Sequence, residues 1–165
     1  MSEKPLISFC IPTYYRAHHL RETLECLLPQ LGSDVDVVIS DHSSTDETEE
    51  VVQLYQWRSP RVRYTSNKVI LGYDRNLLRC LESASGEYAW FFGSDDLLDG
   101  DAVETVRRRI LQSRQRPALV YVNHQVVDNE CRRWSCGEIF VCPWRATARP
   151  LGRDGYICIS CSVIC

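Results

Sequence analysis

Three short polar segments carry the residues whose types and spacing best suit chemistry. They read Pro12-Thr13-Tyr14-Tyr15-Arg16, then Asp41-His42-Ser43-Ser44-Thr45-Asp46, then Ser94-Asp95-Asp96. Together they offer carboxylates, hydroxyls and aromatic rings. Hard oxygen ligands of this kind suit Mg²⁺ or Mn²⁺ bridging a diphosphate, which takes one or two carboxylates and leaves other positions to phosphate and water. The segments therefore predict a site for a phosphorylated ligand and a divalent metal.

Each polar segment directly follows an apolar run that predicts a buried strand. The runs are residues 6–11, which Pro12 stops, 35–39 and 88–92. Continuous apolar runs are typical of strands buried on both faces of a parallel sheet. The carboxyl ends of parallel strands lie at one edge of the sheet, where open α/β sheets bind their ligands. We therefore expect the three segments to converge.

The segments between these strands have the periodicity of helices. Apolar residues recur at steps of three and four from Leu20 to Leu31, and again around 51–55, 77–81 and 103–111. In the third helix Leu77, Leu78 and Leu81 predict the buried face, and Gly86 is expected to end the helix. Further strands are expected at 62–64 and 118–122. This alternation predicts an α/β fold, a Rossmann-like parallel sheet with helices on both faces.

Each polar segment also has a purely structural interpretation. Asp95 and Asp96 could cap the next helix, and the Ser44, Thr45 and Asp46 side chains offer N-cap oxygens. Tyr14 could pack in the core. The occurrence of all three segments at the ends of successive strands favours a binding site over three unrelated caps.

Composition narrows the functional classes. A chain of 165 residues is long enough for one domain, and a formal net charge of -3 gives no reason to expect a nucleic acid partner. No apolar run approaches the ~20 residues that span a bilayer, and residues 1–5 do not resemble an export signal. We therefore expect a cytoplasmic protein, either free or at the inner face of the membrane.

The chain has nine cysteines, and six of them crowd the last third: Cys131, Cys136, Cys142, Cys158, Cys161 and Cys165. Without an export signal, reduced thiols are expected. Cys158-x-x-Cys161 is half of a zinc-site pattern that Cys131 or Cys136 could complete. The spacing of the other pair is irregular and cysteine is also a common core residue, so the structural interpretation is favoured.

The three segments, taken with their strands, resemble a known family. The runs Ile7-Ser8-Phe9-Cys10-Ile11-Pro12-Thr13-Tyr14, Val38-Ile39-Ser40-Asp41-His42-Ser43-Ser44-Thr45-Asp46-Glu47-Thr48 and Gly86-Glu87-Tyr88-Ala89-Trp90-Phe91-Phe92-Gly93-Ser94-Asp95-Asp96-Leu97-Leu98 resemble the inverting glycosyltransferases of family 2 with the GT-A fold. Gly72-Tyr73-Asp74-Arg75-Asn76-Leu77-Leu78 is similar to the branch of abequosyltransferases and other O-antigen sugar transferases.

The resemblance implies one GT-A domain over residues 1–165. Residues 5–125 would be the nucleotide-sugar-binding half, and the cysteine-rich residues 126–165 the start of an acceptor-side half. Members of the family run further, so the chain is expected to be truncated at its C-terminus. Residues 156–165 read like a strand, and residues after 123 are expected to form hairpins or irregular structure.

The resemblance also implies a role for each site residue. Pro12, Thr13 and Tyr14 would form the first donor loop, with Tyr14 stacked on the nucleobase. Asp41 and His42 would contact the nucleoside, and Arg75 would lie near the base or the diphosphate. Asp95 would contact ribose and metal, and Asp96 would be the firmest ligand of a Mn or Mg ion. The donor would be a UDP-, CDP- or dTDP-linked sugar.

Three positions depart from the family pattern. Gly93 replaces the first Asp of Asp-x-Asp-Asp, and Tyr15 replaces an Asn. His42 replaces a second Asp, which bears on the base: a carboxylate accepts the N3 hydrogen of uracil or thymine, whereas cytosine N3 is an acceptor that needs a donor such as His. We therefore hypothesise a cytidine-type donor.

The implied activity is transfer of the sugar, with inversion, to a saccharide or lipid-linked acceptor in the synthesis of cell-surface polysaccharide such as lipopolysaccharide. The catalytic base stays unassigned, although Asp128, Glu130, Glu138 and Asp154 are acids in the expected half. A catalytically incomplete nucleotide-sugar-binding module is the alternative. A dinucleotide-dependent dehydrogenase is set aside, because Pro12-Thr13-Tyr14 follows the first strand in place of Gly-x-Gly-x-x-Gly.

Overall fold

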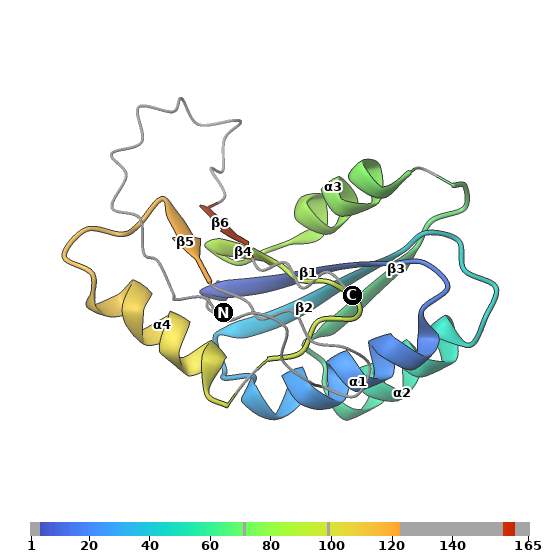
Figure 1. The fold of residues 1–165 in the computed structure, drawn as a ribbon, viewed down its shortest axis with the longest axis horizontal. Coiled ribbons are helices and arrows are strands. Elements are labelled where there is room, and N and C mark those ends of the chain that lie inside the picture. The colour runs from blue at the N-terminus through green and yellow to red at the C-terminus, as the bar shows by residue number, and fades with distance from the viewer. Residues whose placement is uncertain (1–3, 71, 99, 123–156, 161–165) are drawn as a thin grey trace, which may run out of the picture.

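The computed structural model describes residues 4–70, 72–98, 100–122 and 157–160. Its centre is one parallel sheet in the order β3-β2-β1-β4-β6-β5 (Figure 1). The strands are β1 (Ile7–Thr13), β2 (Val35–Asp41), β3 (Val62–Ser66), β4 (Tyr88–Phe91), β5 (Leu119–Tyr121) and β6 (Ile157–Ser160). The alternation of strands and helices in the sequence therefore predicts the fold class correctly.

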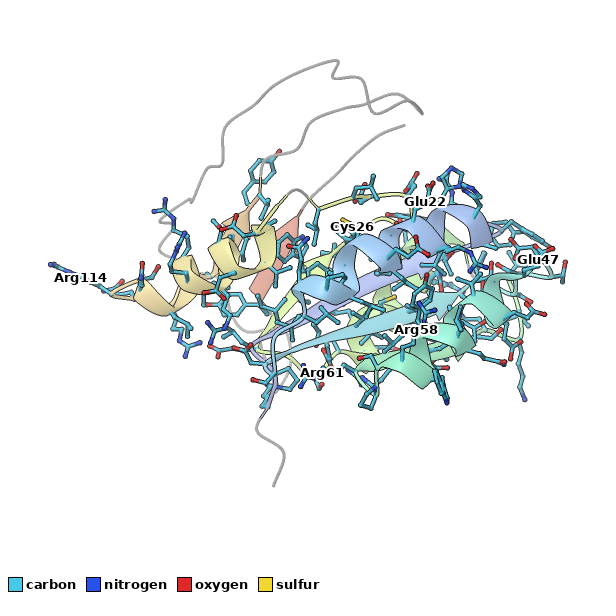
Figure 2. All side chains as sticks on the ribbon, turned by 90° about the horizontal axis from the view of Figure 1, so that it is seen from below. Glu22, Cys26, Glu47, Arg58, Arg61 and Arg114 are labelled. Carbon is cyan, nitrogen blue, oxygen red and sulfur yellow. The ribbon has the colours of Figure 1, made fainter. Side chains whose placement is uncertain are left out.

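Helices cover both faces of this sheet, as expected. Helices α1 (Ala17–Leu27), α2 (Thr48–Arg58) and α4 (Ala102–Gln112) lie on one face, and α3 (Tyr73–Ser83) lies on the other (Figure 1). A short 3-10 turn, η1 (Leu28–Gln30), extends α1. Figure 2 shows α1 and α2 side by side, with Cys26 on α1 and Arg58 at the end of α2. No helix among the described residues is both long and apolar enough to span a membrane.

The larger core lies between the sheet and the three-helix layer. Phe9 stacks on Trp90 with ring centroids 4.7 Å apart and meets Phe92 edge-on at 5.5 Å. Because successive strand residues face opposite sides, Cys10 and Val38 point to the other face and join the smaller cluster under α3. Burial on both faces explains why these strands read as continuous apolar runs.

The sequence prediction is wrong about the buried face of α3. Leu78 is 53% exposed and Leu77 and Leu81 are only partly buried, whereas Asn76 and Cys80 are the buried residues of the helix. The reason is that α3 lies over the small residues of the second cluster and over the strand ends, where a thiol and an amide fit better than leucines. Burial raises the pKa of the Cys80 thiol to about 12, which makes it an inert core group.

Gly86 does not end α3. The helix ends at Ser83, followed by an extended Ala84. Gly86 instead donates its N–H to Ser8 Oγ at 2.8 Å, and a Cβ at this position would lie 2.6 Å from the Ser8 backbone nitrogen. A glycine is needed here because the chain entering β4 passes against the backbone of β1.

The C-terminal part of the chain adds one strand to the described structure. Ile157–Ser160, within the run predicted as a strand, pairs with β4 on one side and β5 on the other. The hairpins expected after residue 123 fall on residues 123–156, which lie outside the described residues.

Candidate functional site

The site lies where the sheet order changes direction, at the carboxyl ends of β1, β2 and β4. The register of β1 with β2 continues to Thr13 and Asp41, but its register with β4 ends at Cys10 and Phe91. Contrary to expectation, Pro12 does not stop the strand. Pro12 lies beyond the last residue pair between β1 and β4. Its backbone nitrogen faces the β4 side, because the carbonyl of Cys10, two residues earlier, accepts the Phe92 N–H from that side. The N–H that proline lacks therefore costs no hydrogen bond between strands. The strands therefore diverge at the position where α/β sheets bind ligands.

The loops after β1 and β2 are joined to each other. Tyr15 donates its backbone N–H to Ser44 Oγ at 2.9 Å, and its hydroxyl lies 3.0 Å from Thr45 Oγ1. Ser44 and Thr45 therefore bind the opposite loop and do not cap α2. Tyr15 and Ser43 have φ of 50° and 63°, a left-handed conformation that costs about 1–3 kcal/mol for residues other than glycine. The hydrogen bonds between the two loops hold the backbone in this conformation.

Asp46 connects the N-termini of two helices. Its carboxylate accepts the Ala17 N–H of α1 at 3.2 Å and the Thr48 N–H and hydroxyl of α2 at 3.3 and 2.6 Å. Asp46 is therefore bonded to the first residues of both helices, although the N-cap positions themselves are Arg16 and Glu47, whose side chains make no cap hydrogen bond. Burial acts to raise the pKa of Asp46, but the hydrogen bonds from Thr48 and Ala17 outweigh burial and hold the pKa below its ordinary value.

Asp41 ends β2 with its side chain buried. It is 1% exposed, and its carboxylate accepts the Ser44 hydroxyl at 2.5 Å, the Ser44 N–H at 3.1 Å and the Tyr64 hydroxyl at 3.1 Å. Burial, together with the neighbouring Asp41 charge, raises the pKa of Tyr64 well above its usual value. The carboxylate is thus fixed in orientation at the floor of the site.

His42 connects three loops. Its backbone N–H donates to the Thr13 carbonyl at 2.9 Å, its Nε2 accepts the Gly72 N–H at 3.1 Å, and its ring lies 5.0 Å from the ring of Tyr14. Because Nε2 is an acceptor, a neutral imidazole here carries its hydrogen on Nδ1. Tyr14 itself is 43% exposed, so part of its ring is available to a ligand.

A buried amide network positions these strand ends, and sequence reasoning missed it. Asn76 Nδ2 donates to the Ser40 carbonyl at 2.9 Å, while its Oδ1 accepts the Ser40 hydroxyl at 2.7 Å and Asn67 Nδ2 at 2.8 Å. Asn67 also donates to the Asp41 carbonyl at 2.7 Å. The available signal was an asparagine one helical turn from Cys80, on a face otherwise free of charge.

The loop after β4 brings in the paired aspartates. Asp95 forms an ion pair with Arg16, whose guanidinium reaches across from the loop after β1. Asp96 is 2% exposed and accepts the Gly93 N–H at 2.8 Å on Oδ2. Thr23 of α1, a polar residue on the leucine stripe, lies 3.1 Å from the Ser94 carbonyl and 3.0 Å from the Asp96 carbonyl and so holds this loop on the helix.

The structure thus joins the loops of Tyr14, Asp41, His42 and Asp95 through direct contacts. Arg75, in the first turn of α3, is exposed and makes no hydrogen bond or ion pair with the described residues. Thr13 Oγ1 is buried and, within the described part of the chain, has no hydrogen-bond partner. Such a hydroxyl costs about 1–3 kcal/mol unless a ligand or water satisfies it.

The carboxylates fit a divalent metal that a ligand helps to hold. No three His, Cys, Asp or Glu side chains of the described residues cluster as a protein-only metal cage. Mg²⁺ and Mn²⁺ need only one or two carboxylates when phosphate and water complete the shell. Asp95 satisfies this requirement, because its side chain is 19% exposed and already binds a cationic group, the Arg16 guanidinium.

Several candidates fall outside the described residues. These are the four possible catalytic acids, Asp128, Glu130, Glu138 and Asp154, and the cysteines of the zinc hypothesis; Cys158 is placed only as part of β6.

A cavity of about 300 Å³ lies at the opposite edge of the sheet, near the amino ends of β2 and β3. Its arginines already have partners: Arg63 forms an ion pair with Asp36 at 2.7 Å, and Arg61 donates to the Gly32 carbonyl. Asp36 also accepts the Ser8 hydroxyl at 2.5 Å. This edge is therefore a structural network, distinct from the candidate site.

A parallel sheet covered on both faces, with acidic and aromatic loops where the strand order changes direction, defines an α/β protein that binds its ligand at the carboxyl ends of the strands. Residues 8–163 match the family model for glycosyl transferase family 2, and the chain belongs to that family.

A curated relative agrees with this assignment, and solved structures share the fold. The chain is 45% identical over 103 residues to abequosyltransferase RfbV of Salmonella typhimurium, a match covering 59% of this chain and 30% of that protein. The structure of TarS 1-349 of S. aureus in complex with UDP-GlcNAc is similar with a TM-score of 0.64 at 23% identity, over 74% of this chain and 35% of that one. The structure of the mannosyltransferase PcManGT of Pyrobaculum calidifontis, in complex with GDP-Man and Mn²⁺, is similar with a TM-score of 0.62 at 20% identity. The match covers 75% of this chain and 36% of that one. The chain spans about a third of the length of these proteins.

Proposed function

We propose that this chain binds a nucleotide sugar at the joined loops and serves in its transfer, with inversion, to a saccharide or lipid-linked acceptor during cell-surface polysaccharide synthesis. The observation that carries the proposal is the linkage of three loops from three strands at one edge of the sheet, through Tyr14–His42, Tyr15–Ser44 and Arg16–Asp95. Membership of glycosyl transferase family 2 and the ligands named for the structural neighbours support it.

The roles follow from exposure and chemistry. The half-exposed Tyr14 ring would stack on the base, beside Pro12 and Thr13 at the end of β1. Asp41, held by Ser44 and Tyr64, would accept a hydrogen bond from the nucleoside. The exposed guanidinium of Arg75 would meet the base or the diphosphate.

Asp95 and Asp96 would hold the metal, with Asp95 also near the ribose. A divalent metal bound there would neutralise the charge that develops on the departing nucleoside diphosphate. The protein's own part is to fix the loop after β4, which carries both aspartates, against α1 through Thr23. The base that deprotonates the acceptor hydroxyl is unassigned.

A thermal-shift panel tests the proposal. We expect UDP- and CDP-sugars to raise the melting temperature more with Mn²⁺ than without it, because only a bound ligand stabilises the folded state. Asp96→Ala should lose the Mn²⁺-dependent part while Glu104→Ala, an exposed acid on α4, keeps it. Nucleotide sugars that never shift the melting temperature would contradict donor binding.

His42 supports a cytidine-type donor. A histidine can donate a hydrogen bond to the acceptor N3 of cytosine, whereas a carboxylate at this position would accept the N3–H of uracil or thymine. In the same panel CDP-sugars should shift the melting temperature more than UDP-sugars. A shift with UDP-sugars alone would exclude the idea.

Turnover separates the enzyme from a binding module that holds the donor without transfer. Release of sugar from the bound donor supports the enzyme, and binding without transfer or hydrolysis supports the module. A place in the cytoplasm, at the inner face of the membrane where lipid-linked acceptors lie, is part of the same proposal and is tested by cell fractionation.

A further inference from the structure

Arg16, which forms the ion pair with Asp95, has a fixed backbone and a guanidinium group that is free to move. The Arg16 carbonyl accepts the Leu20 N–H at 2.8 Å, which anchors the residue at the start of α1. Its side chain makes no helix cap and is 46% exposed, against 19% for Asp95. An exposed pair of this kind changes an equilibrium constant by only about two- to fivefold, so a competing ion can displace the guanidinium.

A second carboxylate, that of Asp96, lies close to the Arg16–Asp95 pair and favours a cation beside Asp95. Asp95 and Asp96 both pack around Gly93, where a Cβ would lie 3.0 Å from Asp95 Oδ1 and 3.0 Å from Asp96 Oδ2. Two carboxylates this close to one point repel each other unless a positive charge compensates them. In the structure the Arg16 guanidinium supplies that charge at Asp95.

We propose that Arg16 is an exchangeable cation of the donor site: it neutralises Asp95 before the metal binds and turns to the diphosphate when metal and nucleotide bind together. This inference rests on the proposed donor binding. A divalent ion brings twice the charge to Asp95, and the planar guanidinium fits phosphate oxygens in a bidentate manner.

The exchange makes metal and nucleotide raise each other's affinity, and such coupling is reciprocal. Metal alone must displace Arg16 from Asp95 without giving the guanidinium a new partner. Metal with nucleotide displaces it and provides one. Arg16 therefore weakens metal binding in the absence of nucleotide and strengthens nucleotide binding in the presence of metal.

The test compares wild type with Arg16→Gln, using electron paramagnetic resonance of Mn²⁺ without and with UDP or CDP, and calorimetry of UDP and CDP in Mn²⁺. Arg16→Gln should bind Mn²⁺ alone about two- to fivefold tighter. It should bind the nucleotide in Mn²⁺ about tenfold weaker, because a charged hydrogen-bond donor to phosphate is lost. Arg21→Gln, an exposed arginine in the same helix, should change neither.

Arg16→Lys keeps the charge without the planar fork and should retain weak Mn²⁺ binding with intermediate nucleotide affinity. Unchanged or weaker Mn²⁺ binding in Arg16→Gln, or affinities for metal and nucleotide that change in the same direction, would overturn the role of Arg16 alone. A wild-type chain that binds neither Mn²⁺ nor any nucleotide would overturn the proposed function as well.

Discussion

At the scale of single residues, the site combines side chains that are fixed with side chains that are exposed. Asp41 and His42 are 1% and 6% exposed and bonded on several sides, whereas Tyr14 is 43% exposed. Buried groups with defined partners hold their orientation without a ligand, which lowers the entropy lost on binding. In the proposed site, the exposed Tyr14 ring would then be the group that a base contacts first.

Replacing Tyr14 tests whether its exposed ring contacts the base. Tyr14→Ala should weaken nucleotide binding by about 5- to 100-fold, the range expected for the loss of one base–aromatic stack. Tyr14→Phe should retain most of the affinity, because the ring and not the hydroxyl is invoked. Calorimetry measures both, with Trp57→Ala, an 86% exposed aromatic on α2, as the control. Equal affinities for wild type and Tyr14→Ala would remove Tyr14 from the site.

At the scale of elements, a few polar side chains fix the loops of the site by bonding to two elements each. Asp46 ties the starts of α1 and α2, and Asn76 ties α3 to the ends of β1 and β2. Each of these residues satisfies backbone groups of two elements at once. The loops between them can therefore hold the left-handed Tyr15 and Ser43.

The Asp46 link predicts a pH dependence. Because the pKa of Asp46 is lower in the folded protein than its ordinary 3.8, its stabilisation is complete above that value and is lost as pH falls through the folded pKa. Asp46→Ala should lower the free energy of unfolding by about 1 kcal/mol at pH 7. The difference from wild type should shrink below pH 3.8.

Urea denaturation across this pH range measures the effect, with Glu47→Ala, which gives α2 no side-chain cap, as the matched control. A stability difference that stays constant down to the acid limit would show that Asp46 acts without its charge.

Gly86 sets the spacing between β1 and the start of β4. Gly86→Ala should lower the free energy of unfolding by about 1–3 kcal/mol, since the added methyl meets backbone atoms that have little room to move. Gly32→Ala is the control, because its Cβ would meet only the end of the Asp34 side chain, at 3.0 Å. Equal losses for the two variants, measured by urea denaturation, would contradict the close-approach explanation.

At the scale of the whole molecule, the fold could be predicted from the sequence because its strands are buried on both faces. The runs at 6–11, 35–39 and 88–92 have one physical cause, and parallel pairing then places the three polar segments at one edge. Features that depend on tertiary contact were not readable. The buried face of α3 depends on the sheet beneath it, and the Arg16–Asp95 pair joins residues 79 positions apart.

The insertion of β6 between β4 and β5 was equally hidden, since a strand pattern gives no information about its neighbours in the sheet. The buried amide network could not be predicted from the sequence for a related reason. Asn67 and Asn76 look like ordinary loop and helix residues until the strand ends with unsatisfied carbonyls are placed beside them.

The loops after β1, β2 and β4 are proposed to form one site for a metal-bound nucleotide, and every other role assigned to the site depends on this. Amide NMR spectra with Mn²⁺ and UDP or CDP test it most directly, because the paramagnetic ion broadens signals from residues close to it. We expect broadening at Tyr14, His42 and Asp95 together, with Arg61 and Ser85 at the opposite edge unaffected. Broadening confined to that opposite edge, or to one of the three loops alone, would contradict a single shared site.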